Sequence, residues 1–324
     1  MSDNVFISYR NSIFQGLNRM MRLKKCFMLA VLALFWTPAF SSLEAQEHIV
    51  VFQRVLTLEV SQIPLTLDIA LSRGDLNIRY QREGELRITG FAKTPAGKIA
   101  AEQFFKSGLV ITQDKQHVTI KNAPNAPDAD VQIELNVPYR TELTSVVTGV
   151  GNQKLIGISG PAKLQSGEGD MEVTFVRLGR VQVRTGKGKI ACTRVIQLDA
   201  ETGEGNVVLL EDAITKAVIK KGSGRMEIGG ARDTLDATTD TGLLHVKAVP
   251  VADWKLKSGS GNIRIELPPK SGFEIAASTT SGNISSERDD VKSPEGSAHE
   301  LQQKVNGGGK HIQVQSVSGN ISIE

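Results

Sequence analysis

The chain has little of what commonly stabilises small exported domains or anchors proteins in membranes. It contains 2 cysteines in 324 residues, and aromatic residues make up only 5% of it. Its apolar stretch Phe27–Trp36 has ten residues, whereas a helix needs about 20 to span a bilayer. The composition therefore argues against a disulfide framework, a core of large aromatic side chains and a membrane-spanning helix. Glycine is abundant instead, at 31 residues, which favours tight turns between short strands.

Residues 1–45 have the three parts of a secretory leader. A positive stretch over residues 22–25 is followed by the apolar residues 27–36 and by small residues between 39 and 45. We interpret residues 1–19 as an artefactual extension upstream of the true start. The alternative, a membrane anchor, is disfavoured by the shortness of the apolar stretch.

Cleavage of this leader is expected between Ala39 and Gln46, because small residues lie there, directly after the short apolar stretch. The intact mass of the exported protein, measured by mass spectrometry, checks this. A mass that still includes Phe27–Trp36 would contradict it.

Net charge excludes one class of partner. The leader carries five basic and two acidic residues, so the chain from residue 46 onward has 33 of each sign and no net charge. Nucleic-acid binding therefore has no electrostatic basis in this chain. Cys192 is the one cysteine left after cleavage, which makes an intramolecular disulfide impossible.

An internal repeat dominates the second half of the chain. A turn of the form Ser/Thr-Gly-x-Gly recurs with variations, as in SGEGDME, TGKGKIA, TGEGNVV and SGSGNIR. Successive intervals between its second glycines are 18, 19, 17, 19, 18, 19, 21 and 37 residues. These glycines are Gly151, Gly169, Gly188, Gly205, Gly224, Gly242, Gly261, Gly282 and Gly319.

Apolar residues occupy fixed positions around that glycine. They stand two and four residues after it, and seven and five residues before it, with mostly polar residues between. Such alternation on both sides of a turn predicts two half-buried strands per repeat. One repeat cannot bury its apolar face alone, so stacked copies must share a core. At about 4.8 Å per repeat, eight stacked repeats would form a rod of roughly 40 Å.

The sequence thus predicts an all-β protein, a β-solenoid of 18–19-residue, two-strand rungs over residues 148–324. Residues 46–147 form a less regular, β-rich N-terminal part, with a short helix expected over 97–105 and a loop over 122–129. Residues 287–310 are polar and lack alternation, so we interpret them as a loop inserted into one rung. Asparagine follows the glycine in five turns and predicts a ladder of stacked side chains.

The stretches LSRGDLNI and IELNVPYRTELTSVVTGVGN and the repeated turns resemble the bacterial "putative adhesin" family of β-strand-repeat domains, a domain of unknown function. The resemblance covers roughly residues 55–324. It implies an exported β-solenoid and brings no catalytic residues with it.

Three motifs have simpler structural explanations. Arg73-Gly74-Asp75 is an integrin-type tripeptide, but it stands where the repeat turn requires glycine and a polar residue. Calcium-binding rolls need an aspartate where Met171 and Ile190 stand. Gly186–Lys189 lacks the spacing and the following helix of a phosphate-binding loop.

Candidate catalytic and metal-binding residues are also missing. The five histidines are scattered without metal-binding spacing, and His245 is expected on the surface. Cys192 takes an inward position and is expected to be an inert buried thiol. The outward column three residues after the glycine brings no two acids onto adjacent repeats. We therefore assign no catalytic, cofactor-binding or metal-binding residue, and no cofactor.

These observations favour an exported, non-catalytic interaction or structural module at the cell envelope, adhesin-like in character. Its partner would be an envelope component, either glycan or protein, and its location periplasmic, secreted or on the cell surface. A carbohydrate-active β-helix enzyme is the alternative, and it would need a carboxylate cluster assembled on the folded surface. A component of an envelope-stress sensor is another, which would be encoded beside a membrane-bound regulator.

Overall fold

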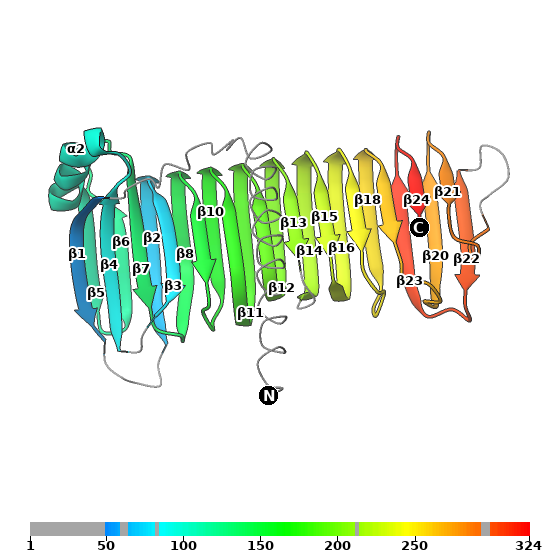
Figure 1. The fold of residues 1–324 in the computed structure, drawn as a ribbon, viewed down its shortest axis with the longest axis horizontal. Coiled ribbons are helices and arrows are strands. Elements are labelled where there is room, and N and C mark those ends of the chain that lie inside the picture. Colours follow the sequence, from blue (N-terminus) through cyan, green and yellow to red (C-terminus); the bar gives the residue numbers. More distant parts are fainter. Residues whose placement is uncertain (1–48, 59–63, 82–83, 211–213, 293–298) are drawn as a thin grey trace, which may run out of the picture. The chain divides into compact units, whose positions relative to one another are not determined.

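The structure is a computed structural model that describes residues 49–58, 64–81, 84–210, 214–292 and 299–324 (Figure 1). His48–Glu324 forms one compact unit, and everything below concerns this unit. The predicted leader lies outside the described residues. The prediction of an all-β protein is confirmed, since strands make up 67% of the structure and helices 5%. Within the described residues, no helix is long and apolar enough to cross a membrane.

The strands form two rows that belong to one open sheet, because the long strands β11 (Met171–Lys187) and β12 (Ile190–Glu204) bend from one row into the other. Row A comprises, in spatial order, β5 (Leu109–Asp114), β6 (His117–Asn122), β2 (Leu65–Arg73), β8 (Thr141–Val150), β10 (Ala162–Glu168), the later halves of β11 and β12, β14 (Ile214–Ser223), β16 (Ala231–Thr241), β18 (Trp254–Ser260), β23 (Lys310–Ser316), β20 (Phe273–Thr279) and β22 (Glu300–Val305). Row B comprises β1 (Ile49–Thr57), β4 (Glu85–Ala92), β7 (Val131–Val137), β3 (Asp75–Tyr80), β9 (Gln153–Ile156), the earlier halves of β11 and β12, β13 (Val207–Leu210), β15 (Met226–Gly229), β17 (Leu244–Lys247), β19 (Ile263–Glu266), β24 (Ile321–Ile323) and β21 (Ile284–Ser286).

Each repeat supplies one strand to row B, directly after its glycine, and one to row A, directly before the next glycine. Equivalent residues of neighbouring repeats pair in parallel, as Val173 does with Cys192 and Leu209 with Ile228. The apolar residues that the sequence places at the four inward positions are all at most 6% exposed. Ser286, the exception beside the long interval, is only partly buried. Alternation read from the sequence therefore identified the core side of both rows.

The corner that carries the repeated glycines, called here the glycine edge, stacks backbone directly on backbone. Gly188 has a φ of +145°, and a Cβ there would lie 2.1 Å from the carbonyl oxygen of Gly169. The predicted ladder of side chains runs beside these glycines, but each side-chain oxygen accepts from the backbone N–H of the neighbouring repeat. Six acceptors make this bond at 2.8–2.9 Å: Asp75, Asn152, Asp170, Asn206, Asn262 and Asn320.

The order of the repeats in space departs from their order in sequence at both ends. The terminal strands β23 and β24 lie between β18–β19 and β20–β21, so Ile312 pairs with both Trp254 and Ile275. Near the other end, β2 lies between β6 and β8. The last strand is therefore an interior strand of row B, which the linear repeat did not predict.

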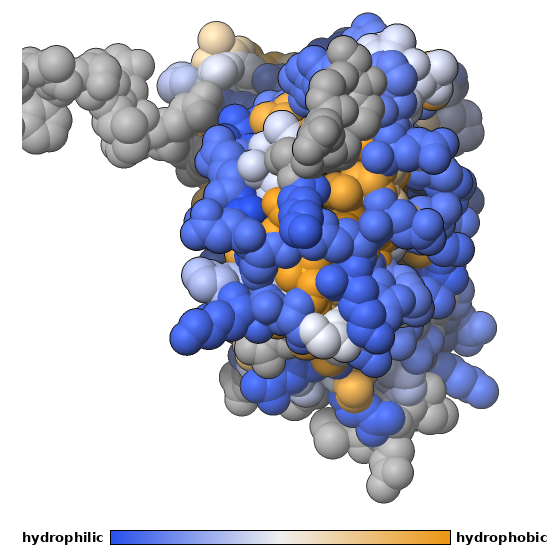
Figure 2. Space-filling model, turned by 90° about the vertical axis from the view of Figure 1, so that its right-hand side faces the viewer, coloured by the Kyte–Doolittle hydropathy of each residue, from blue (hydrophilic) through white to orange (hydrophobic). Residues whose placement is uncertain are grey.

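The prediction of a loop over residues 287–310, inserted into one rung, is wrong in part. Glu300–Val305 forms strand β22, which pairs antiparallel with the outer edge of β20 and buries Leu301 and Val305. Val291 is also buried. Pairing with β22 occupies one edge of β20 and leaves the other for β23. Figure 2, which faces this end, shows apolar surface between polar side chains.

The N-terminal part closes the opposite end with antiparallel strands: β1 pairs with β4, β4 with β7, and β5 with β6. The predicted helix is present as the 3-10 turn η1 (Pro95–Gly97), α2 (Lys98–Gln103) and the π-turn η2 (Phe104–Gly108). Its buried Phe105 lies against Gly90, where a Cβ would meet the ring at 2.3 Å. The predicted loop lies between β6 and β7.

Candidate functional site

A groove of about 970 Å³ lies where the turns after β15, β17 and β19 meet the end of β24. The turn after β15 is the single residue Gly230, whereas those after β17 and β19 span residues 248–253 and 267–272. This difference in turn length leaves a hollow beside the two longer turns. The residues that line it are Gly230, Ala231, Lys247, Ala248, Val249, Val251, Arg264, Glu266, Leu267, Pro268, Pro269 and Glu324.

Apolar side chains form most of this lining. Val249 and Val251 are 51% and 46% exposed, which is unusual for valines beside a well-filled core. Ala248 and Leu267 are buried next to them. A concave, mainly apolar surface with a few polar groups at its side is the usual form of a ligand site.

Four charged side chains form the polar wall of the groove, namely Lys247, Arg264, Glu266 and Glu324, and His245 contacts one of them. Glu266 accepts from Lys247 Nζ at 2.9 Å, and its other oxygen lies 2.8 Å from His245 Nε2. Arg264 pairs with both Glu266 and Glu324. The hydrogen bond from Lys247, followed by the contribution of His245, lowers the pKa of Glu266 below its ordinary value. Glu266 therefore stays ionised at neutral pH.

Glu266 and Glu324 are the carboxylates that a glycoside hydrolase would need, yet their surroundings do not suit that chemistry. A hydrolase keeps one carboxyl group protonated, with a raised pKa, so that it can donate its proton to the leaving oxygen. Here the pKa of Glu266 is lowered, and Arg264 pairs with both carboxylates. The arrangement is suited to holding charge in place, and Glu266 is ionised where a general acid would have to be protonated.

The sequence analysis missed this pair for two reasons. It compared only the outward residues three positions after each repeat glycine, and it assumed that the repeats stack in the order of the sequence. Both acids stand five residues after a glycine, Gly261 and Gly319, and are 58 residues apart. They meet because β24 pairs with β19. A comparison of every outward column, without an assumed order of repeats, could have found them.

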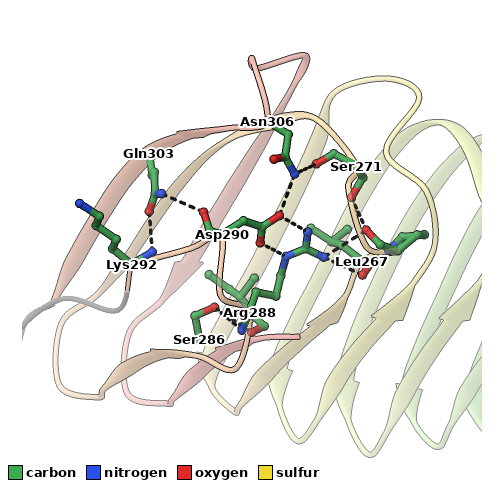
Figure 3. A network of polar contacts seen from close by, with 10 residues as sticks. Leu267, Ser271, Ser286, Arg288, Asp290, Lys292, Gln303 and Asn306 are labelled. Atoms are coloured by element: carbon green, nitrogen blue, oxygen red, sulfur yellow. Dashed lines mark hydrogen bonds and ion pairs between the residues drawn. The ribbon is translucent and has the colours of Figure 1, made fainter.

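An arginine network supports one side of the groove (Figure 3). The Arg288 guanidinium donates to the carbonyl oxygens of Leu267 and Pro268 at 2.8 and 3.1 Å. It also bonds both carboxylate oxygens of Asp290, at 2.8 and 2.7 Å. Asn306 Nδ2 adds a bond of 2.7 Å to Asp290. The side chain of Arg288 is 8% exposed, so this network holds the turn after β19 from the inside.

Replacing Arg288 by Met should lower the free energy of unfolding by roughly 2 kcal/mol, because Asp290 and two turn carbonyls lose a charged donor. The bond from Arg288 is the largest cause of the lowered pKa of Asp290. That pKa should therefore rise in the variant. Denaturant unfolding and an NMR titration of the carboxyl group measure the two effects.

The exposed Lys292→Met is the matched control and should change neither quantity. An unchanged pKa of Asp290 in Arg288→Met would contradict the network.

The tripeptide Arg73-Gly74-Asp75 makes structural contacts within the protein. The Asp75 carboxylate bonds Lys93 Nζ at 2.8 Å and accepts from the backbone N–H of Asn152. Arg73 pairs with Asp128 at 3.4 Å. With its carboxylate engaged in the ladder, the tripeptide is explained by structure.

The other residues considered in the sequence analysis, Cys192, Gly186–Lys189 and His245, do not come together in one site. Cys192 is fully buried, and burial raises the pKa of its thiol to about 12. Gly186–Lys189 is an ordinary turn of the glycine edge. His245 is 13% exposed and lies against Glu266, so it is less exposed than predicted. Among the described residues, no three His, Cys, Asp or Glu side chains could hold a metal ion together.

Lys221 is a buried titratable residue that the sequence reasoning passed over. Three residues before the glycine, the other repeats carry a buried hydroxyl: Thr148, Ser166, Thr185, Thr202, Thr239, Ser258, Thr279 and Ser316. In the repeat of Gly224 the residue at this position is Lys221, which is 3% exposed. Its buried amine has no hydrogen-bond partner among the described residues. Burial lowers its pKa to about 8. The signal in the sequence was KGSG in place of the usual Ser/Thr-Gly.

The fold and the groove define an all-β repeat protein with a mainly apolar groove on its turns. The chain belongs to the Toastrack DUF4097 family, which matches residues 66–324. This confirms the resemblance to the bacterial "putative adhesin" family.

One of the similar solved structures agrees with this chain in fold. A protein described as a "putative adhesin" from Parabacteroides distasonis is 11% identical and has a TM-score of 0.51, covering 86% of this chain and 98% of its own. A second "putative adhesin", from Bacteroides fragilis, is 10% identical and has a TM-score of 0.39. The match covers 84% of this chain and 96% of that protein. A "putative lipid binding protein" from Parabacteroides distasonis is 10% identical with a TM-score of 0.33, over 84% and 96%. At TM-scores below 0.5, the second and third likenesses support no argument. A search of curated proteins found no match.

Proposed function

We propose that the protein is an exported, non-catalytic β-solenoid that works as an interaction module at the cell envelope, adhesin-like in character, and binds its partner in the groove. The observation that carries this proposal is the groove of about 970 Å³, whose lining is mainly apolar and whose carboxylates are held by cations. Such a surface can hold a ligand, and its ionised Glu266 is not a proton donor for hydrolysis.

Export is supported by the leader pattern over residues 1–45 and is implied by the resemblance to the bacterial "putative adhesin" family. The proposal of a solenoid is supported by the parallel pairing of equivalent residues in successive repeats of 17–19 residues. Val173 pairs with Cys192, Cys192 with Leu209, and Leu209 with Ile228. The proposed location is the periplasm, the cell surface or the medium. The absence of net charge from residue 46 onward weighs against nucleic acid as a partner.

The test is a pull-down of the tagged, exported chain against envelope fractions and purified glycans. Val251→Asp places a charge on the apolar lining, while its backbone and the core beneath stay unchanged. Val317→Asp is the matched control, because Val317 is 59% exposed at the glycine edge. Retention of an envelope component should be lost in the first variant and kept in the second. Equal retention by both would place the binding surface elsewhere.

The second candidate function, a carbohydrate-active enzyme, is favoured by the meeting of Glu266 and Glu324 in the groove. Incubation with purified envelope polysaccharides, with Glu266→Gln as control, tests it. Release of reducing ends by the unchanged chain, and none by the variant, would favour the enzyme over the binding module.

A further inference from the structure

The two ends of the rows differ in how they are protected. At the end formed by β20, β21, β22 and residues 287–292, the described residues include no exposed large apolar side chain. The strand that ends row A there, β22, carries the charged residues Glu300 and Lys304. Charges on an end strand hinder its pairing with another chain. This end of the molecule is therefore protected.

The strand that ends row B at the opposite end, β1, lacks this protection (Figure 1). It is nine residues long, pairs with β4 alone among the described strands, and carries Arg54 as its single charge. Val50 and Val55 are 56% and 46% exposed, and Ile99 of the neighbouring helix α2 is 70% exposed. A long, mainly apolar end strand with an unpaired edge is a template for a further strand.

Row B also projects beyond row A at this end. Outward from β2, row A has the strands β6 and β5, whereas outward from β3, row B has β7, β4 and β1. Helical residues cover the first half of β1, since Phe105 of η2 stacks on Phe52 with 5.2 Å between the ring centroids. The second half is open: Gln53, Arg54, Val55 and Thr57 are exposed. Only the carbonyl of Thr57, its last residue, accepts a bond from a side chain of row A, that of Gln113.

The partner that fits this edge is the same edge of a second copy. Pairing of β1 with the other end of a second copy would have to use the charged strand β22, and its repetition would build an open filament. Pairing of β1 with β1 about a two-fold axis matches one apolar edge with another, and it closes after two copies. The difference between the two ends of the chain thus selects a two-fold dimer.

We propose that two copies of the chain join through the second half of β1, which runs antiparallel to its counterpart about a two-fold axis at Val55. An axis at Arg54 would place two like charges directly opposite each other. An axis at Val55 brings the two exposed valines into contact and places Gln53 opposite Thr57 of the second copy. Row B then continues from one copy into the other.

The dimer would carry the two grooves on opposite sides. An antiparallel joint reverses the direction of every strand in the second copy, so its turns lie along the opposite edge of the joined rows. The grooves beside β15, β17 and β19 are then far from the joint and face opposite ways. One dimer can therefore hold two partners at once and gain avidity. This consequence rests on the proposed function, whereas the joint itself does not.

Light scattering of the exported chain during gel filtration tests the joint. The unchanged chain should have twice the mass of one copy. Val55→Lys places two like charges directly opposite each other and should give the mass of one copy at the same concentration. The matched control is Val317→Lys, because Val317 is 59% exposed at the glycine edge, and it should stay dimeric. Circular dichroism of each variant confirms that it is folded.

A disulfide tests the position of the axis. Paired residues of antiparallel strands have their Cα atoms about 4.5–5.5 Å apart, within the range of about 4.4–6.8 Å that a disulfide spans. Val55→Cys should therefore give a covalent dimer on a non-reducing gel after mild oxidation, whereas Val317→Cys should not. The native Cys192 is buried and does not compete. A single-copy mass for the unchanged chain, or equal cross-linking of the two variants, would overturn the inference.

The pull-down separates this inference from the proposed function. If the chain is monomeric but an envelope component is retained through the groove, the joint is wrong and the proposed function stands. If the chain is dimeric but nothing is retained, the joint stands and the proposed function is wrong. If Val55→Lys instead releases a different envelope protein from a monomeric chain, β1 has another occupant and the inference is wrong.

Discussion

Replacing Ile228 by Asp is expected to cost several kcal/mol of unfolding free energy, and so to unfold the protein or nearly so. Ile228 is 1% exposed and stacks between Leu209 and Val246 in row B. A carboxylate at this position would lie in the core without a cation or hydrogen-bond donor beside it. Because neighbouring repeats share one core, the loss should spread along the rows. Urea unfolding followed by circular dichroism measures it.

The matched control is Glu227→Ala, one residue earlier. Glu227 points outward and makes an ion pair with Arg225 at 3.6 Å, with both side chains about half exposed. Such a pair contributes little, so the change should be less than about 0.5 kcal/mol. Comparable losses from both substitutions would mean that the assignment of inward and outward sides is wrong.

Replacing Lys221 by Met should have the opposite effect and stabilise the protein, by roughly 2 kcal/mol at neutral pH. Methionine keeps a long, unbranched apolar side chain at this position, and the substitution removes the buried amine that has no partner among the described residues. The exposed neighbour Lys220→Met is the control and should leave stability within about 0.5 kcal/mol.

The pH dependence of this effect follows from the lowered pKa. In the folded protein the pKa of Lys221 is about 8, against 10.5 for an ordinary lysine. Between these two values the unfolded chain binds more protons than the folded chain, so stability rises with pH. The advantage of Lys221→Met should therefore be complete below pH 8, shrink from pH 8 to 10.5, and vanish above. An advantage that does not change with pH would show that the amine has no part in it.

The core residues could be predicted from the sequence because the two patterns that identify them are local. Alternation decides which side of a strand is buried, and the glycine interval decides which residues of neighbouring repeats are equivalent. Met171, Ile190 and Trp254 were placed inward on that basis and are buried. Asn152 was placed in a ladder beside the glycines and makes its bond there.

The segment 287–310 could not be assigned in the same way. Leu301 and Val305 are four residues apart among polar neighbours, too sparse an alternation to predict a strand. The strand forms because the outer edge of β20 offers unpaired backbone groups to it. Arg288 likewise becomes buried only where the turn after β19 supplies carbonyl oxygens.

The sequence by itself determined the all-β class, the two strands of each repeat, their inward faces and the tight glycine corner. The tertiary structure alone decided which repeats are neighbours at the ends, and hence the meeting of Arg264, Glu266 and Glu324 in one groove. The physical reason lies in the repeat itself. Equivalent strands have nearly the same backbone edge and the same buried apolar side. The local sequence therefore allows β19 to pair equally well with β21 or with β24, and in the structure β24 lies between them. The choice between them depends on β22 and the lengths of the turns, whose effects appear only when the whole chain has folded.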